Sequence, residues 1–162
     1  MLLNHRPVEM RDIPAICGFP DTEQELFFFF PKACWPLSPE QLMTVINKRM
    51  NNTVVEYEGQ VVAFANLYYS KPGECAIGNV IVSPTVRGKG VGRYLIKTME
   101  EKAFARHPTA HVTISCFNEN VAGLLLYSSL NFLPCTIEER TNHIGQSVAL
   151  IHLHKYPATV LD

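Results

Sequence analysis

Charge is scarce in this sequence, and the two signs are almost evenly balanced. Asp, Glu, Lys and Arg make up 18% of the 162 residues, against about 25% in a typical globular protein. A hydrophobic share of 47% excludes an intrinsically disordered chain, because disorder requires low hydrophobicity and high charge. The formal net charge of −1 excludes an extended basic surface that would hold a polyanion. We therefore expect no nucleic-acid partner and no membrane partner.

Long hydrophobic runs and paired cysteines are also missing. The longest apolar runs, Leu26–Phe30 and Val61–Ala65, are far shorter than the ~20 residues that span a bilayer. The first seven residues contain no apolar stretch typical of a secretory signal. The five cysteines are odd in number, scattered and never spaced Cys-x-x-Cys, which favours free thiols in a reducing compartment. We expect a single cytoplasmic domain over residues 1–162, long enough to fold without disulfides or metal ions.

Strand and helix patterns are intermixed along the chain. Apolar residues recur at helical spacing over Gly90–Arg106 and Asn120–Leu130, and another helix is expected from Ser38, which can cap it. The aromatic segment Pro20–Pro36 has little periodicity, and we expect a loop there. Strands are expected at Leu3–Val8, Thr53–Tyr57, Gln60–Tyr69, Cys75–Val82, His111–Cys116, Cys135–Glu139 and Gln146–Lys155. This order predicts an α/β fold with a mixed sheet of about seven strands and helices packed on its faces.

The most informative segment is a glycine-rich turn between the strand that ends at Val82 and the helix that begins near Gly90. Glycines let backbone amides approach a ligand, and the unpaired amides at a helix start suit a diphosphate. The segment contains three cations, Arg87, Lys89 and Arg93, so it is locally basic. It lacks the Gly-Lys-Ser/Thr ending of a P-loop, and its glycine spacing differs from the dinucleotide-binding fingerprint.

Two motifs resemble those of the GNAT superfamily of N-acetyltransferases. Arg87-x-x-Gly90-x-Gly92 after Val82-Ser-Pro is similar to the family's acyl-coenzyme A loop. The segment from Asn120 to Phe132 is similar to the family pattern Asn-x-x-Ala-x-x-Leu-Tyr-x-x-x-Gly-Phe, with Gly123 for Ala and Asn131 for Gly. The resemblance covers most of the chain and is weakest over Pro20–Met50. It implies a mostly antiparallel, splayed sheet with helices on both faces.

The resemblance also implies an activity and a site. The activity is transfer of an acetyl group from acetyl-coenzyme A to a primary amine, with no metal ion. Tyr127 would protonate the leaving thiolate as general acid, and Asn120 would bind the coenzyme A arm or cap its helix. The residues implied to bind the cofactor are Val80, Ile81, Val82, Arg87, Gly88, Lys89, Gly90, Val91, Gly92, Arg93 and Asn120.

The general base is not evident from the sequence. Many relatives have a glutamate near the position of Ala76, and ribosomal-protein alanine acetyltransferases have one at the position of Ser115. Both carboxylates are missing here, which leaves Glu74, a histidine or an ordered water as the base. Their absence also leaves open a non-catalytic acyl-coenzyme A sensor or a nucleotide-phosphate binder.

The acceptor is likewise open: a small-molecule amine or a peptide would fit. The aromatic residues Phe27–Phe30 and Trp35 line the core, form an acceptor pocket or make a dimer contact. His152 and His154 alternate on one strand face, but they lack the carboxylate or cysteine spacing of a zinc site. The resemblance allows a homodimer.

Overall fold

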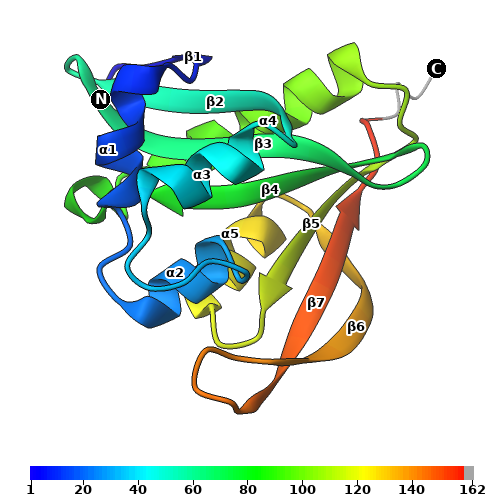
Figure 1. Ribbon diagram of the computed structural model, residues 1–162. Helices are drawn as coiled ribbons and strands as arrows, with labels where there is room; N and C mark the ends of the chain where they lie inside the picture. Colours follow the sequence, from blue (N-terminus) through cyan, green and yellow to red (C-terminus); the bar gives the residue numbers. More distant parts are fainter. Residues whose placement is uncertain (159–162) are drawn as a thin grey trace.

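The computed structural model describes residues 1–158, which form one seven-stranded sheet and five α-helices (Figure 1). The strands are β1 (Leu3–Pro7), β2 (Met50–Tyr57), β3 (Gln60–Lys71), β4 (Glu74–Val82), β5 (Val112–Phe117), β6 (Leu133–Thr141) and β7 (Ser147–Lys155). The helices are α1 (Ile13–Cys17), α2 (Glu23–Phe29), α3 (Pro39–Ile46), α4 (Val91–Arg106) and α5 (Val121–Ser129). None of the helices in this part of the chain is long and apolar enough to cross a membrane.

The sheet divides between its fourth and fifth strands. Its strand order is β1-β2-β3-β4-β5-β7-β6, and β4–β5 is the one parallel pair among the described strands. These two strands pair only where Cys75–Ile77 lies beside Val112–Ile114. Beyond that point β4 continues to Val82 and β5 to Phe117 without pairing with each other, although each stays paired with its other neighbour. The sheet is therefore splayed. The predicted mixed, mostly antiparallel and splayed sheet is confirmed.

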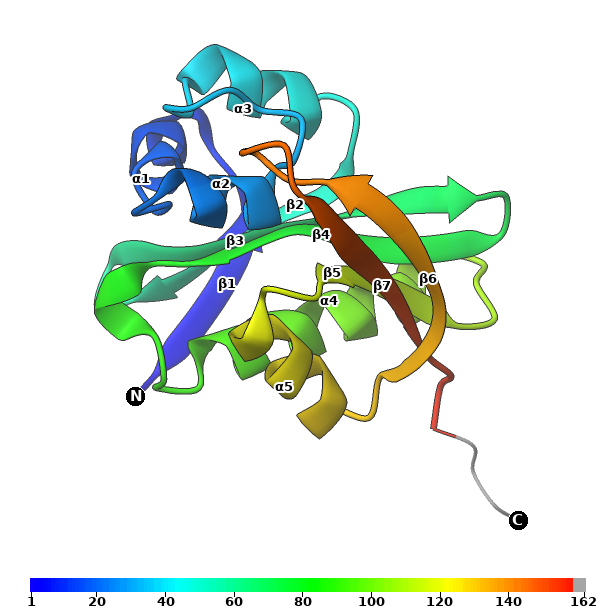
Figure 2. The same cartoon turned by 90° about the horizontal axis from the view of Figure 1, so that it is seen from below.

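Helices cover both faces of the sheet, as predicted (Figure 2). One face carries α4 and α5, and the other carries α1, α2 and α3. The core beneath α4 is built on Leu95, Ile96 and Met99, which are fully buried. A second core, including Ile16 and Leu42, lies beneath α1 and α3. The split between β4 and β5 therefore lies between two layers, one formed by α4 and α5 and the other by α1, α2 and α3.

The loop expected over Pro20–Pro36 is wrong for Glu23–Phe29, which form helix α2. The Thr22 side chain caps the helix by accepting a hydrogen bond from the Glu25 amide at 3.1 Å. The consecutive phenylalanines hid the helix because they are buried in different directions: Phe29 packs in the core beneath α1 and α3, whereas Phe27 packs against Phe117. Thr22 and Glu25 have the Thr-x-x-Glu spacing of a capping box, which was the available sequence signal.

A bulge in β4 redirects the end of this strand. Asn79 has a φ of 48°, and the pairing with β3 shifts register at this point. The amide of Asn66 donates to Asn79 Oδ1 at 2.9 Å, and Asn79 Nδ2 donates to the Phe29 carbonyl at 3.1 Å. These hydrogen bonds attach α2 to the part of β4 that lies beyond the split. A bulge with hydrogen-bonded side chains is a local device that turns a strand end.

Candidate active site

A cleft of about 580 Å³ opens where β4 and β5 part. Its walls come from α2, the end of β4, the glycine-rich turn, the start of α4, and α5. The predicted site residues that line it are Val80, Ile81, Val82, Arg87, Gly88, Gly90, Gly92, Arg93, Asn120 and Tyr127. The fold therefore gathers into one cavity most of the residues that two separate sequence motifs indicated.

Backbone conformation explains the glycines of the turn. Gly88 has a φ of 75° and Gly90 a φ of 87°, in the left-handed region that disfavours side chains. A Cβ at either position would meet nothing within 4 Å, so the requirement is conformational and not one of packing. Gly90 precedes α4, and no side chain caps that helix. The first amides of α4 are therefore left for a ligand at the positive end of the helix dipole.

The cations of the turn differ in what they contact. Arg87 donates from Nε to the Val82 carbonyl at 3.1 Å, and its guanidinium forms an ion pair with Glu25 of α2. Arg93 donates to the Ser129 hydroxyl of α5 at 2.9 Å. Lys89 is exposed and is not among the cleft residues. Arg87 thus links the turn to β4 and α2. Glu25, which the sequence motifs did not indicate, offsets part of the positive charge of Arg87.

Val91 is the other predicted cofactor residue outside the cleft lining. It is 1% exposed and packs in the core beneath α4. Its side chain therefore anchors the start of the helix, and only its backbone amide belongs to the unpaired first turn. The predicted role for Val91 concerns that amide, and it stays a prediction.

Tyr127 lies on the α5 wall of the cleft and is 5% exposed. Burial raises the pKa of its phenol well above the ordinary value, and nearby Cys116 raises it further. Burial likewise raises the pKa of the Cys116 thiol to about 12. Both groups therefore hold their protons at neutral pH, so Tyr127 is present as a hydrogen-bond and proton donor. Cys116 packs in the core next to α5, as a thiol without nucleophilic character.

Asn120 caps α5 and also reaches the cleft. Its Oδ1 accepts a hydrogen bond from the Gly123 amide at 3.0 Å. A Cβ on Gly123 would come within 2.7 Å of Asn120 Nδ2 and 3.0 Å of Cys116 Sγ. The glycine at this position, where relatives have alanine, therefore makes room for the capping side chain. Of the two functions open for Asn120, capping is the one seen in the structure.

Glu74 lies at the opposite end of β4 from the cleft. It accepts hydrogen bonds from Ser70 at 2.7 Å and His111 at 3.0 Å, and it pairs with Lys71 at 3.3 Å. Burial acts to raise the pKa of Glu74, but these three partners together outweigh it and the pKa is lowered. The carboxylate is thus ionised and already bound at the β3–β4 hairpin. It is not among the residues that line the cleft.

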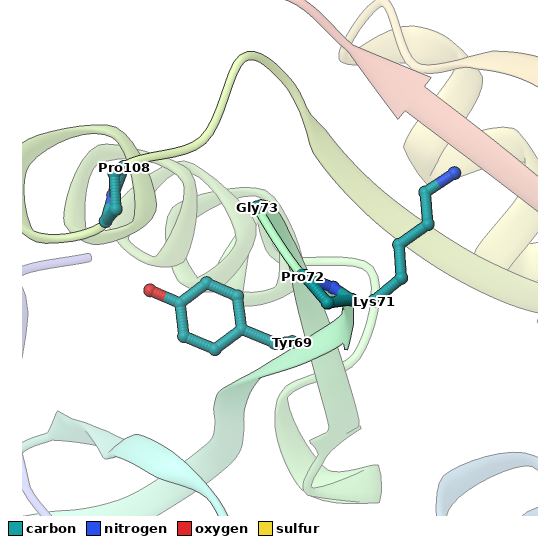
Figure 3. A pocket seen from close by; sticks show the side chains of 5 residues that line it. All are labelled: Tyr69, Lys71, Pro72, Gly73 and Pro108. Carbon is teal, nitrogen blue, oxygen red and sulfur yellow. The ribbon is translucent and has the colours of Figure 1, made fainter.

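A second cavity, of about 420 Å³, lies at that hairpin (Figure 3). Its lining is formed by Tyr69, Lys71, Pro72, Gly73 and Pro108, and Lys71 extends away from the tyrosine ring. The Tyr69 hydroxyl is bound to His107 Nδ1 at 3.0 Å, so this polar group already has a partner. Nothing in this cavity resembles a reaction centre.

The histidines expected to be weak metal candidates do not form a ligand set. His154 contacts the rings of His111 and Tyr156 at centroid distances of 5.5 and 5.3 Å. His152 is hydrogen-bonded to Ser115 and Glu138. In residues 1–158, no three His, Cys, Asp or Glu side chains gather in a way that could hold a metal ion.

The structure has a sheet that parts beside an uncapped helix start, with a buried tyrosine on the wall of the adjacent cleft. This is the arrangement expected for an acyl-coenzyme A-dependent acyltransferase. The chain belongs to the acetyltransferase (GNAT) family, because the model of that family matches residues 19–132. It is an acetyl-coenzyme A-dependent acyltransferase, and acetyl-coenzyme A is its co-substrate. Among curated proteins, none matches the chain.

Solved structures share this fold over almost the whole chain. Ribosomal-protein-alanine N-acetyltransferase from Brucella melitensis is 22% identical, with a TM-score of 0.77 over 97% of this chain and 100% of that one. The phosphinothricin acetyltransferase from Sinorhizobium meliloti, solved with acetyl-coenzyme A, is 15% identical, with a TM-score of 0.80 over 96% and 89%. Ribosomal-protein-S18-alanine N-acetyltransferase from Escherichia coli is 21% identical, with a TM-score of 0.70 over 98% and 97%.

Proposed function

We propose that this acyltransferase transfers acetyl groups to a primary amine by direct attack, with acetyl-coenzyme A and the acceptor bound together. The observation that carries the proposal is the cleft, which extends from the uncapped start of α4 to Tyr127 along the end of β4 that is not paired with β5. The α4 amides would bind the diphosphate, and backbone groups of Val80–Val82 would hold the pantetheine arm. Holding both reactants in line removes much of the entropic barrier to their reaction.

The proposed reaction consists of attack by the amine, collapse of the tetrahedral intermediate and protonation of the thiolate. The amine lone pair attacks the thioester carbonyl, whose developing negative charge the backbone amides of β4 would stabilise. The tetrahedral intermediate then collapses and the carbon–sulfur bond breaks. Tyr127 gives its proton to the departing thiolate and regains one from the nitrogen as the amide forms. The raised pKa means that the phenol still holds its proton when the thiolate leaves. The assignment itself rests on the position of Tyr127 in the cleft wall.

The acceptor would approach from the face that carries α2. Phe28 and Phe29 line the cleft, so part of the aromatic segment Phe27–Phe30 supports an acceptor pocket. Phe27 belongs instead to the core, and Trp35 is 43% exposed outside the cleft. The structural neighbours are named for a ribosomal-protein alanine and for phosphinothricin, so an α-amine on a small molecule or a peptide is the class to test first.

The test measures release of coenzyme A thiol and the mass of the acetylated product. The acceptor panel comprises alkylamines, amino acids, phosphinothricin and peptides that begin with alanine. Kinetics with both substrates varied should give intersecting double-reciprocal lines, as a ternary complex requires. Parallel lines, or calorimetric binding of acetyl-coenzyme A without transfer to any amine, would contradict the proposal. ADP binding as tight as that of coenzyme A would count against recognition of the pantetheine arm.

The cellular compartment and the oligomeric state of the protein stay predictions. The five free cysteines, of which Cys75 and Cys116 are buried, support a reducing compartment such as the cytoplasm. The homodimer allowed by the family resemblance is checked by light scattering of the purified protein.

A further inference from the structure

Three side chains from three strands form a hydrogen-bonded row on the face opposite α4 and α5. Ser115 Oγ of β5 lies 2.6 Å from His152 Nδ1 of β7. His152 Nε2 lies 2.9 Å from Glu138 Oε1 of β6. Arg140 donates to the same Glu138 oxygen at 2.8 Å. None of these residues lines the cleft, and Ser115 is one of the two positions at which the carboxylate expected from the family resemblance is missing. A serine, a histidine and a carboxylate in this order can pass a proton.

The row begins at the split in the sheet. Ile114 is the last residue of β5 that pairs with β4, so Ser115 is the first residue beyond the split. Ile114 and Cys116 point into the core beneath α4, and Ser115 therefore points to the other face. On that face Phe117 contacts Phe27 of α2, beside the proposed acceptor side. Ser115 is half-buried, so its hydroxyl is held in place and can still meet a ligand.

The hydrogen bonds define which histidine nitrogen carries the proton. Hydrogen bonds from Arg140 and then His152 lower the pKa of Glu138, so this carboxylate is ionised and can only accept. His152 Nε2 must therefore donate to it. In a neutral imidazole the other nitrogen, Nδ1, is then an acceptor, and the Ser115 hydroxyl donates to it. The row is thus arranged to move a proton from Ser115 towards His152.

We propose that Ser115, His152 and Glu138 form the proton relay that deprotonates the acceptor's ammonium group. The inference rests on the proposed function and deepens it, because it assigns the acceptor class: an aliphatic amine, which is protonated at neutral pH. The ammonium gives one proton to Ser115 Oγ as the serine proton moves to His152 Nδ1. Glu138 stabilises the resulting imidazolium, and the neutral amine attacks the thioester. His152 is 31% exposed and then releases that proton to water.

Several charged and titratable groups surround the relay, and they bear on its pH dependence. Burial raises the pKa of Tyr68, while the Arg49 guanidinium and then the Ser115 hydroxyl act to lower it. Arg49 lies over the Tyr68 ring, 3.8 Å from its centroid. The groups on this face are Arg49, Tyr68, Glu138, Arg140, His154, His111 and Tyr156.

The first test compares two acceptors, the best alkylamine of the panel and an arylamine, which is neutral at pH 7. With the alkylamine, Ser115→Ala and His152→Gln should each lower kcat about 10²-fold at pH 7, with KM for acetyl-coenzyme A unchanged. The loss should shrink as the pH approaches the ordinary amine pKa of about 10, because the amine then loses its own proton. With the arylamine the loss should be absent. Equal losses with both acceptors would overturn the relay.

Glu138 is a positioning residue, because it acts through His152. Glu138→Gln should lower kcat less than His152→Gln does, and it should shift the acid limb of the rate profile to lower pH, since a neutral amide no longer stabilises the imidazolium. A change in KM alone would mean that Glu138 is merely structural. His154→Gln is the matched control, because this next histidine on the same face of β7 contacts aromatic rings and not Ser115. The control should keep wild-type kinetics.

A second readout needs no acceptor and separates the relay from the proposed function. Nitrogen-15 NMR of the histidine side chains should show neutral His152 with its proton on Nε2, and Glu138→Gln should alter that tautomer equilibrium. A proton on Nδ1 in the wild-type protein would overturn the relay even if amines are acetylated. Mass spectrometry after incubation with acetyl-coenzyme A alone should find Ser115 unmodified. An acetylated Ser115 would make it a nucleophile and contradict its assignment as part of a base.

Discussion

At the residue scale, burial determines which side chains of the cleft can exchange protons. Tyr127 and Cys116 are both buried, and burial raises both of their pKa values. The phenol stays protonated because ionisation in an apolar wall would cost far more than in water. Tyr127 is buried like a core tyrosine, but it also lines the cleft, so its proton can reach a bound ligand.

Replacing Tyr127 with phenylalanine tests the assigned proton donor. We expect kcat for amine acetylation to fall by about 10²-fold, within the range of general acid catalysis, while binding of acetyl-coenzyme A measured by calorimetry changes little. Because the pKa is raised, wild-type activity should show no loss of the Tyr127 proton up to pH 9. Tyr94→Phe is the control, since Tyr94 bonds to His5 on the surface and is not a cleft residue. An unchanged kcat in Tyr127→Phe would remove Tyr127 from the chemistry.

The absence of a Cβ at Gly78 leaves room for the stacked side chains of Arg49 and Tyr68. A Cβ there would lie 2.4 Å from Arg49 Nη1 and 2.9 Å from Tyr68 Cε1. Gly78→Ala must therefore displace the stacked pair, and we expect urea denaturation to show a loss of about 1–3 kcal/mol in the free energy of unfolding. Gly18→Ala is the matched control, because its nearest contact would be an ordinary 3.4 Å. If both variants unfold at the same urea concentration, the Arg49–Tyr68 stack is loosely held.

At the element scale, the glycine-rich turn combines left-handed backbone conformations with a proposed role in binding coenzyme A. Gly90 and Gly145 both have left-handed φ values, 87° and 82°, and a Cβ at either would meet nothing within 4 Å. Each alanine substitution should therefore cost a similar ~1 kcal/mol in unfolding free energy. Only Gly90→Ala should weaken binding of coenzyme A, since Gly145 lies in the β6–β7 turn. Calorimetry with coenzyme A makes the comparison, and equal affinities would contradict a phosphate-binding turn.

Helix α2 shows where sequence reasoning about elements failed. The helices over Gly90–Arg106 and Asn120–Leu130 were predictable from apolar residues at helical spacing, although Val121 and Leu125 of α5 are exposed in the structure. In α2 successive phenylalanines face different cores, so no stripe exists to detect. The direction in which each ring is buried depends on strands and on a bulge that are distant in sequence. For the same reason, the sequence did not indicate Glu25 at the cleft, and it left Phe28 and Phe29 open between the core and an acceptor pocket.

At the scale of the whole molecule, the N-terminal segment is fastened by one buried ion pair. Arg6 of β1 makes two hydrogen bonds to the Asp12 carboxylate, at 2.8 and 2.9 Å, and a third to Glu56 of β2 at 2.9 Å. The Asp12 side chain is 4% exposed, and the hydrogen bond from Arg6 is the main reason that its pKa is lowered. This contact joins the first strand to the sheet and to the start of α1.

Asp12→Asn should show how pH acts through this pair. Because the folded-state pKa of Asp12 is depressed, its contribution is present above the unfolded value near 4 and is lost as the pH falls through the folded value. We expect the variant to lose about 2 kcal/mol of unfolding free energy at pH 7, and the difference from the wild type should shrink as the pH falls below the unfolded value. Urea denaturation at several pH values measures this. Asp21→Asn, at an exposed carboxylate, should change little at any pH, and a pH-independent loss in Asp12→Asn would contradict the ion-pair account.

The glycine turn and the Tyr127 segment could be found in the sequence because each is a local pattern. Positive φ values require glycine, and a helix start with nearby cations can be recognised from adjacent residues. Ser115, His152 and Glu138 could not be found in this way, since they come from three strands and give no motif. Only the missing carboxylates at Ala76 and Ser115 indicated that another base was needed.

The sequence by itself determined the fold class, the conformation of the glycine-rich turn and the identity of the tyrosine proposed as proton donor. The near-zero net charge predicts a surface without an extended basic field, and the turn still concentrates three cations at one helix start. Only the tertiary structure decided that β4 and β5 part at Ile77 and Ile114, and which residues then face each other across the gap. The physical reason is that strand register and hydrogen bonds between distant segments depend on packing of the whole sheet, whereas turn and helix preferences act within a few residues.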